Sequence, residues 1–385
     1  MKSLDDYASG KLTELDSQNL KRKLVTTHRS INGGANRAGR KLISFSCNDY
    51  LNLTNDDRLI KAAQSAIEKY GVGAGASRLV TGNHPLYQEL ENRLAKLKGT
   101  EDACVFGSGY LANLGIIPSL VGAEDLVVVD ELSHACILSA SKLSSSHVEI
   151  FRHNDTNHVA QILKQFRDGT RHAMILTDGV FSMDGDLAPL SELSFLARDY
   201  DCWLMTDDAH GVGVLGAGRG TTFATGHPAA DVPLQMGTLS KAIGSYGGYL
   251  CSSRKVIDLI RTRARTFIYS TGLPPSVVAA SIKALDIIEH NPELCSKPIK
   301  NARLFTQSLG LPKAKSCIVP LVLQDPQRAL QASQLLEEEG FLVTAIRPPT
   351  VPMGTARLRF AFTAAHSPED IQRLTEIVKH KILKD

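Results

Sequence analysis

Lys241 lies in the segment TLSKAIGSYGG, where a short apolar run ends and small residues follow. Small neighbours leave room for a planar ligand beside the amine. A lysine withdrawn from water is also a better nucleophile for an aldehyde, because desolvation disfavours its charged form. A lysine taken alone is more often a solvated surface residue, so this interpretation depends on the groups that accompany Lys241.

Further polar groups follow apolar runs in the same way. Asp207 ends the run CWLMT and could pair with a protonated pyridine nitrogen, and His210 follows three residues later. Gly109 and Tyr110 follow DACVF in a turn of small residues that enters a helix and could bind a phosphate. His134 follows LVVVD and could stack on an aromatic ring. The alternatives are a helix cap for Asp207, an ordinary strand–helix turn for Gly109 and Tyr110, and a structural histidine for His134.

No metal site is predicted. His153 and His158 are separated by five positions, which does not suit a pair of ligands on one helix face, and no cysteine lies near them. The sequence also contains no nucleophile elbow and no P-loop.

The elements that must position these groups alternate between strands and helices from about residue 100 to 252. The predicted strands are DACVFG, DLVVVDE, VEIFRH, HAMILTDGV, CWLMTDDA, PLQMGTL and GGYLCSS. Continuous apolar strands separated by helices predict a mostly parallel, buried sheet. The link between the last two strands is too short for a helical crossover, so one of them is expected to be antiparallel. Ligands bind at the carboxyl ends of such strands, where the polar groups above are found.

Composition restricts the class of protein. Hydrophobic residues make up 43% and charged residues 22% of 385 residues, and the net charge of +3 does not suggest a nucleic-acid-binding protein. No apolar run approaches the ~20 residues that cross a bilayer, and the N-terminus lacks the apolar core of a signal peptide. The seven cysteines form no CxxC pair and indicate a reducing compartment. We therefore expect a cytoplasmic protein without nucleic-acid or membrane partners.

With these segments in view, the chain resembles the α-oxoamine synthase family of fold-type I pyridoxal-phosphate (PLP) enzymes. The matching segments run from about residue 44 to 366 and are SFSCNDYLNL, GAGASRLVTGNHPLYQELE, FGSGYLANLG, DELSHACI, GVFSMDGDLAPL, DDAHGVGVLGAGRG, TLSKAIGSYGGY, IYSTGLPP and AIRPPTVPMGTARLRFAFTAAH. One departure is Asn52, which stands where glycine is common in this family.

The resemblance implies an α/β PLP-dependent transferase fold of the aspartate aminotransferase type. It has a mostly parallel central sheet and a smaller C-terminal α/β domain. The expected parts are an N-terminal arm over 1–45, with a helix within residues 11–30, a large PLP-binding domain over 46–285 and a small domain over 286–385. In the small domain, residues 326–340 and 367–384 are expected to be helices.

The resemblance also implies the roles of individual residues. Lys241 would form a Schiff base with pyridoxal 5'-phosphate, Asp207 would pair with the ring nitrogen, and His134 would stack on the ring; with His210 these are the expected catalytic residues. The other expected cofactor contacts are His210 and Ser182 at the phenolic oxygen, Gly109, Tyr110 and Thr238 at the phosphate, and Thr271 of the partner subunit. The expected substrate contacts are Asn48 and Arg359 at the carboxylate, together with Ser77 and Arg347.

The activity that the resemblance implies is a condensation of L-alanine with an acyl thioester and release of CO2 by a homodimer. Pimeloyl-CoA or pimeloyl-acyl carrier protein is the expected thioester. One alternative is a glycine-using member, of the 5-aminolevulinate synthase or 2-amino-3-ketobutyrate CoA ligase type. Another is a cofactor-free binding module on the same fold, which would not need to retain Lys241, Asp207 and His210 together.

Overall fold

The computed structural model describes residues 2–224 and 232–383. The chain divides into two compact units, one formed by residues 48–300 and the other by residues 1–47 together with 301–385. Each unit has its own sheet and its own buried core. The predicted strand and helix segments fall within these units.

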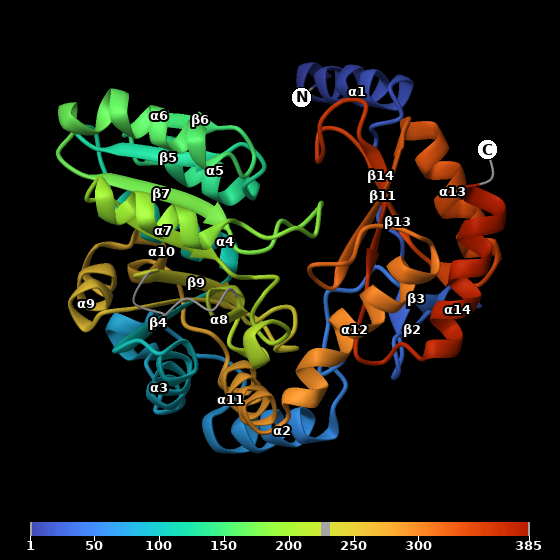
Figure 1. Cartoon of the computed structure of the whole chain (residues 1–385). Coiled ribbons are helices and arrows are strands. Elements are labelled where there is room, and N and C mark those ends of the chain that lie inside the picture. The colour runs from blue at the N-terminus through green and yellow to red at the C-terminus, as the bar shows by residue number, and fades with distance from the viewer. Residues whose placement is uncertain (1, 225–231, 384–385) are drawn as a thin grey trace. The chain divides into compact units, whose positions relative to one another are not determined.

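A seven-stranded sheet forms the centre of the larger unit in the described part of the chain (Figure 1). From one edge to the other, its strands are β4 (Asp102–Phe106), β10 (Gly248–Ser252), β9 (Leu234–Thr238), β8 (Trp203–Asp207), β7 (Ala173–Asp178), β5 (Leu126–Asp130) and β6 (His147–Phe151). β10 runs antiparallel to both neighbours, and the other pairs are parallel. The predicted mostly parallel sheet is confirmed, as is the single antiparallel strand after the short link.

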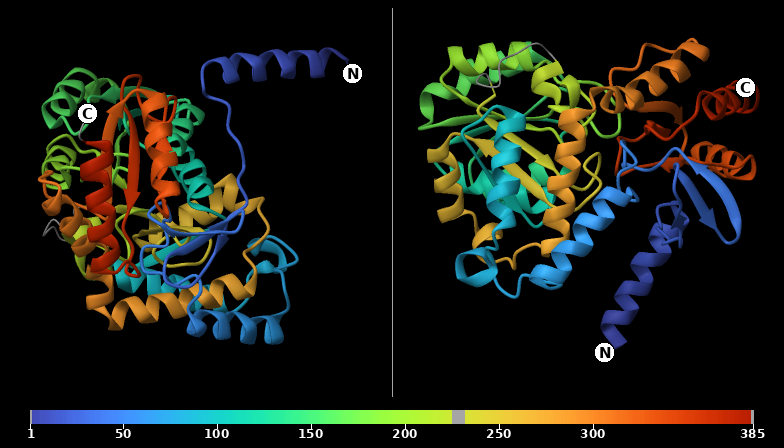
Figure 2. Two further views of the ribbon diagram at one scale, coloured as in Figure 1. Left: turned by 90° about the vertical axis from the view of Figure 1, so that its right-hand side faces the viewer. Right: turned by 90° about the horizontal axis from the view of Figure 1, so that it is seen from below.

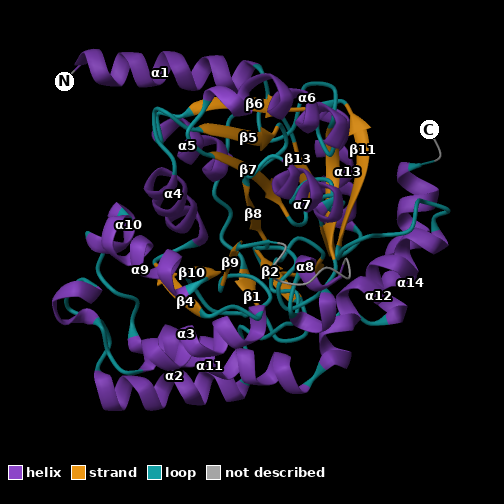
Figure 3. Ribbon diagram, turned by 60° about the vertical axis from the view of Figure 1, so that its left-hand side comes forward, coloured by secondary structure: helices purple, strands orange, loops and turns teal. Residues whose placement is uncertain are grey.

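Helices cover both faces of this sheet because its strands are apolar on both sides (Figure 3). Val127 and Val129 of β5 pack into one core with helices α4 (Gly109–Leu120), α5 (Ala135–Leu143) and α9 (Arg254–Arg263). Leu126 and Val128 of the same strand pack into a second core with α6 (Thr156–Phe166) and α7 (Leu190–Asp199). Successive residues thus point to opposite faces, as the two-residue period of a strand requires.

The larger unit also contains α2 (Asp57–Tyr70), a single π-helical turn at Arg78–Gly82, α3 (Leu86–Lys98), α8 (Thr221–Ala224), α10 (Arg265–Ile268) and α11 (Pro275–His290). Asn52 precedes α2 and has a φ of 56°. This left-handed conformation favours glycine, and asparagine is one of the few side chains that tolerate it. The departure from the family pattern at Asn52 therefore preserves the backbone conformation.

The smaller unit has two sheets. β11 (Ile318–Gln324), β14 (Ala356–Ala361) and β13 (Thr344–Ile346) form an antiparallel sheet that packs with α13 (Pro326–Glu338) and α14 (Pro368–Ile377). β1 (His28–Arg29), β2 (Gly34–Arg37), β3 (Arg40–Ser44) and β12 (Phe341–Leu342) form the other. Ser367 caps α14 by accepting a hydrogen bond from Asp370 N, as its sequence predicts. The last residue of that predicted helix, 384, lies outside the described residues.

The division of the chain differs from the predicted one in two respects. Residues 1–45 are not a separate arm, because β3 pairs in parallel with β12, about 300 residues later. The division between the units also falls after residue 300 and not after 285. The expected helix within residues 11–30 is wrong in its bounds: α1 spans Lys2–Ser17, ends before the β-branched run at 25–27, and has no buried residue (Figure 2).

The structure also bears on the cysteines and on membrane insertion. None of the seven cysteines forms a disulfide, and five of them are buried. Among the described helices, none combines the length and the apolar character needed to span a membrane.

Candidate active site

A cavity of about 150 Å³ opens at the carboxyl ends of the parallel strands in the larger unit. Its wall contains many of the residues that the sequence analysis singled out. The lining residues are Gly109, Tyr110, His134, Cys136, Asp178, Val180, Asp207, Ala209, His210, Met236, Thr238 and Lys241. Gly109 and Lys241, which are 132 positions apart in the sequence, thus meet at the place where an open parallel sheet binds its ligands.

Lys241 is held by a chain of hydrogen bonds that runs back to the start of this unit. Its Nζ lies 2.8 Å from His210 Nε2, and His210 Nδ1 lies 2.6 Å from the buried hydroxyl of Tyr50. The Tyr50 hydroxyl donates to Asn48 Oδ1 at 3.2 Å. The tautomer of His210 with its proton on Nδ1 fits these contacts, because Nδ1 then donates to Tyr50 and Nε2 accepts from the lysine. The chain therefore holds the imidazole ring and positions the amine.

Asp207 presents a carboxylate at the end of β8. Its Oδ2 accepts from Asn113 Nδ2 at 2.8 Å and its Oδ1 accepts from Ala209 N at 3.0 Å. Both donors are neutral, so the negative charge remains available to a cationic group in the cavity. Burial and the nearby charge of Asp207 raise the pKa of Asp178 well above its ordinary value.

Asp208, next in the sequence, has an entirely different environment. Lys98 Nζ donates to it at 2.7 Å, and both side chains are fully buried. Thr221 also donates to Asp208 through its amide and its hydroxyl. Two adjacent carboxylates are thus distinguished by their partners: Asp208 belongs to a closed structural ion pair, and Asp207 faces the cavity.

His134 caps the N-terminus of α5, where its Nδ1 accepts from Cys136 N at 3.3 Å. Burial lowers the pKa of His134, which favours its neutral form. Tyr110 lies edge-on to it, with ring centroids 6.5 Å apart. A neutral imidazole in the cavity wall suits stacking on a planar aromatic ligand.

The start of α4 provides donors for an anion. The amides of Gly109 and Tyr110 lie in the first turn and have no carbonyl partner within the helix. A Cβ on Gly109 would lie 3.3 Å from Met236 Cε and 3.5 Å from Thr238 Oγ1, so the start of the helix lies close to β9. The Thr238 hydroxyl, which donates to Gly247 O at 2.7 Å, lies on the same side.

These observations test whether the residues fit PLP. A lysine amine, an unneutralised buried carboxylate, a neutral imidazole and a helix N-terminus all line one cavity. The amine matches the aldehyde of PLP, and the carboxylate matches its ring nitrogen. The imidazole matches the face of the ring, and the helix N-terminus matches the phosphate. The residues fit the cofactor, and Lys241, Asp207, His134, Gly109 and Tyr110 would hold it.

The other predicted site residues lie outside the wall of this cavity. Ser182 lies in the turn after β7. Ser77 and Thr271 form an isolated antiparallel bridge with each other, elsewhere in the larger unit. Arg359 is a buried residue of β14 in the smaller unit, and Arg347 of that unit donates to Asn19 O. The roles of these residues remain predictions.

Three residues of the site escaped the sequence analysis. Tyr50 and Asn113 orient His210 and Asp207, and Asp178 lies in the cavity wall. Tyr50 and Asn113 fall in the segments SFSCNDYLNL and FGSGYLANLG, which the sequence analysis quoted without giving either residue a role. Asp178 ends the run AMILTD just as Asp207 ends WLMTD, so the rule that polar residues follow strands could have found it.

Comparison with known proteins agrees with this site. The family model described as aminotransferase class I and II matches residues 40–378. A protein of Parvibaculum lavamentivorans named putative 8-amino-7-oxononanoate synthase is 60% identical over 385 residues, which cover 100% of this chain and 99% of that protein. The 8-amino-7-oxononanoate synthase of Beijerinckia indica is 59% identical over 378 residues, which cover 98% of each chain.

Solved structures share the fold. Serine palmitoyltransferase of Sphingomonas wittichii aligns with a TM-score of 0.91 at 30% identity, over 98% of this chain and 96% of that one. The 8-amino-7-oxononanoate synthase of Francisella tularensis aligns with a TM-score of 0.76 at 27% identity, over 89% of this chain and 98% of that one. The chain therefore belongs to the class I and II aminotransferase family, in which it groups with the 8-amino-7-oxononanoate synthases.

Proposed function

We propose that this chain catalyses the PLP-dependent condensation of L-alanine with a pimeloyl thioester. The products are 8-amino-7-oxononanoate, CO2 and the free thiol, as in biotin biosynthesis. The observation that carries the proposal is the meeting of Lys241, Asp207 and His134 in one cavity, in a chain whose full-length relatives carry that name.

When bound, PLP supplies a carbonyl that the amino acid can condense with and a ring that accepts the electrons of the α-carbon. Asp207 would keep a positive charge on the ring nitrogen, because its own charge is not neutralised by its two hydrogen-bond donors. His134 would cover one face of the ring and exclude water from it.

Lys241 acts as the proton carrier. With the amino acid bound, Nζ would take the α-proton of alanine and later return a proton to the product carbon. His210 Nε2 lies 2.8 Å from that amine and holds it in place between the two transfers. Tyr50 prevents rotation of the imidazole by fixing Nδ1.

The carboxylate of alanine is assigned to Asn48 and Arg359, with Arg347 assisting in substrate binding. A guanidinium suits this task because it grips a carboxylate with two parallel hydrogen bonds. Asn48 already belongs to the chain that leads to Lys241, which supports its place near the reacting carbon.

We also propose that the active form is a homodimer in the cytoplasm. Thr271 and Ser77 lie outside the cavity wall of their own subunit and are bridged to each other. Because this backbone bridge places the two residues side by side, the role proposed for Thr271 in the partner's site extends to Ser77.

One experiment tests the function. The purified protein is incubated with L-alanine or glycine and with pimeloyl-CoA, pimeloyl-acyl carrier protein or shorter acyl thioesters, and the amino ketone is identified by mass. The proposal predicts 8-amino-7-oxononanoate from alanine and a pimeloyl thioester. A product only from glycine would replace the proposal with a glycine-using synthase, and no product from any pair would refute it.

A further inference from the structure

Glu91 is a buried carboxylate that the catalytic proposal does not use. It points from α3 towards the edge strand β4, and its side chain is only 3% exposed. Oε1 accepts from Arg78 Nη1 at 2.5 Å and from Val105 N at 2.9 Å. Oε2 accepts from Arg78 Nη2 at 3.0 Å and from Arg261 Nη2 at 3.2 Å. Four donors saturate the carboxylate, which is the condition for keeping a charge buried.

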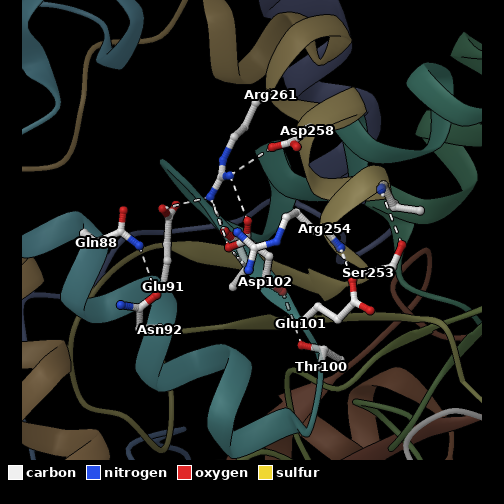
Figure 4. Close-up of polar contacts among 12 residues, drawn as sticks. Gln88, Glu91, Asn92, Thr100, Glu101, Asp102, Ser253, Arg254, Asp258 and Arg261 are labelled. Carbon is white, nitrogen blue, oxygen red and sulfur yellow. Dashed lines mark hydrogen bonds and ion pairs between the residues drawn. The ribbon is translucent and has the colours of Figure 1, made fainter.

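Arg261 extends this network over the edge of the sheet (Figure 4). It reaches Asp102 at 3.0 Å and donates to Ala103 O at 2.8 Å. Together, Glu91 and Arg261 therefore satisfy backbone groups on the outer edge of β4, at Val105 N and Ala103 O. β4 leads directly into the turn before Gly109, so the hydrogen bonds that hold β4 also support the proposed phosphate site.

Arg78 joins Glu91 to the segment that follows Ser77. Its Nε donates to Asn83 Oδ1 at 3.0 Å, and its guanidinium lies 3.9 Å from the centre of the buried Tyr87 ring. Burial opposes the charge of Arg78, but the hydrogen bond to Glu91 and the negative charge of Glu91 together outweigh it and raise the pKa of Arg78. The π-helical turn over 78–82 is thereby tied to α3 at its first residue, and Arg78 also bonds Asn83 just after the turn.

The segment that contains Thr271 is held by the same part of α3. The Tyr87 hydroxyl accepts from Leu273 N. Gly272 N donates to Ala76 O at 3.0 Å, and a Cβ at Gly272 would lie 3.0 Å from Gly82 O. The loops that carry Ser77 and Thr271 thus lie against each other, with α3 behind both.

We propose that Arg78 and Glu91 are positioning residues that hold the Ser77 and Thr271 loops as one rigid surface for substrate and cofactor. The effect that we infer on the reaction rests on the proposed function, whereas the rigidity of the two loops does not. Arg78 and Glu91 touch no reacting atom; they act through Ser77 and Thr271. A glutamine at 91 would turn an amide N–H towards arginine donors and loosen both loops, although the helix and its cap remain.

The test compares Glu91→Gln with Glu89→Gln. Glu89 lies on the same helix and is half exposed, and among the described residues its ion pair is with Arg93 at 3.2 Å, so its loss should change little. Hydrogen exchange is followed in the holoenzyme at the amides of residues 76–83 and 271–273. We expect exchange of both segments to accelerate about tenfold in Glu91→Gln and to stay unchanged in Glu89→Gln. Unchanged exchange in Glu91→Gln would overturn the proposal whatever the enzyme catalyses.

Kinetics then test the consequence for the reaction. With pimeloyl-CoA saturating, Glu91→Gln should raise KM for L-alanine about tenfold while kcat per bound cofactor falls less than about threefold. The alanine-to-glycine ratio of kcat/KM should fall as well. Equal kinetics in the two variants would overturn the positioning role. A wild-type protein that converts no alanine would instead refute the proposed function and leave the exchange result standing.

Arg78→Lys provides a second route if Glu91→Gln does not fold. Lysine keeps the charge beside Glu91 but cannot make the two parallel bonds or lie flat on Tyr87. The same acceleration of exchange in both segments is expected. Acceleration confined to residues 76–83 would show that the two loops are independent and would overturn the proposal.

Discussion

Replacing Asp207 with asparagine removes one charge from the cavity while leaving the side chain nearly the same size. The structure shows why the change is not conservative. Oδ1 of Asp207 accepts from the main-chain Ala209 N at 3.0 Å, and Oδ2 accepts from Asn113 Nδ2 at 2.8 Å. The new amide nitrogen must take the place of one oxygen, so it either faces the fixed donor Ala209 N or requires Asn113 to turn over and give up its contact with Cys136 Sγ.

Two energies follow from this geometry. The hydrogen bond lost at Ala209 N or at Asn113 costs about 1–3 kcal/mol of folding stability, as for a buried polar group that loses its partner. Loss of the charge opposite the ring nitrogen costs ~3–4 kcal/mol in the transition state, on the scale of other electrostatic deletions, which lowers kcat about 10²- to 10³-fold. The first effect is measured by thermal unfolding and the second by turnover of L-alanine with pimeloyl-CoA per bound cofactor.

A double variant separates the two effects. In Asp207→Asn with Asn113→Asp, the amide at 207 can donate to a carboxylate at 113, so stability should largely return while turnover stays low. If the single variant keeps turnover within about threefold of wild type, Asp207 does not supply the charge that we assign to it. If the double variant recovers turnover together with stability, the single variant was merely misfolded.

Three further predictions follow from individual contacts. Tyr50→Phe removes the hydroxyl that fixes the neighbouring imidazole, and we expect kcat to fall about tenfold with the cofactor still bound; an unchanged kcat would show that the imidazole is held by other groups. Ser77→Thr adds one methyl to the segment that we assign to the substrate, and should shift the alanine-to-glycine ratio of kcat/KM about tenfold towards glycine; an unchanged ratio would remove Ser77 from the specificity site. Burial opposes protonation of His153, but hydrogen bonds to Asp130 and Asp186 raise its pKa to about 10. Its stabilising charge is therefore present in full below pH ~6.5 and is lost as the pH rises towards 10, so the gap in melting temperature between wild type and His153→Gln should shrink over that range; a gap that is constant with pH would contradict the charged pair.

The strand-end rule explains what the sequence could predict. Lys241, Asp207 and His134 were identified because each follows an apolar run, and parallel strands bring their carboxyl ends to one edge of a sheet. The alternation of strands and helices also predicted the direction of β10, since the short link before it excludes a crossover. These features depend on the order of apolar and polar residues along the chain and on the lengths of links, and a single sequence contains both.

The contacts that tune the site depend on long-range packing instead. Tyr50 meets His210 across 160 positions, and Asn113 meets Asp207 across 94. No local pattern pairs such residues, because many other polar residues could meet an aspartate or a histidine equally well. The pairing of β3 with β12, which merged the predicted arm with the C-terminal unit, belongs to the same class of contact.

The identity of the lysine that carries the cofactor is the central claim, and borohydride reduction tests it most directly. Reduction of the holoenzyme makes the link between PLP and its lysine permanent, and peptide mass spectrometry then locates the label. The account predicts a label on Lys241, whose amine lies 2.8 Å from His210 in the cavity, and no label in Lys241→Ala. A label on any other lysine, or an undiminished label in Lys241→Ala, would contradict it.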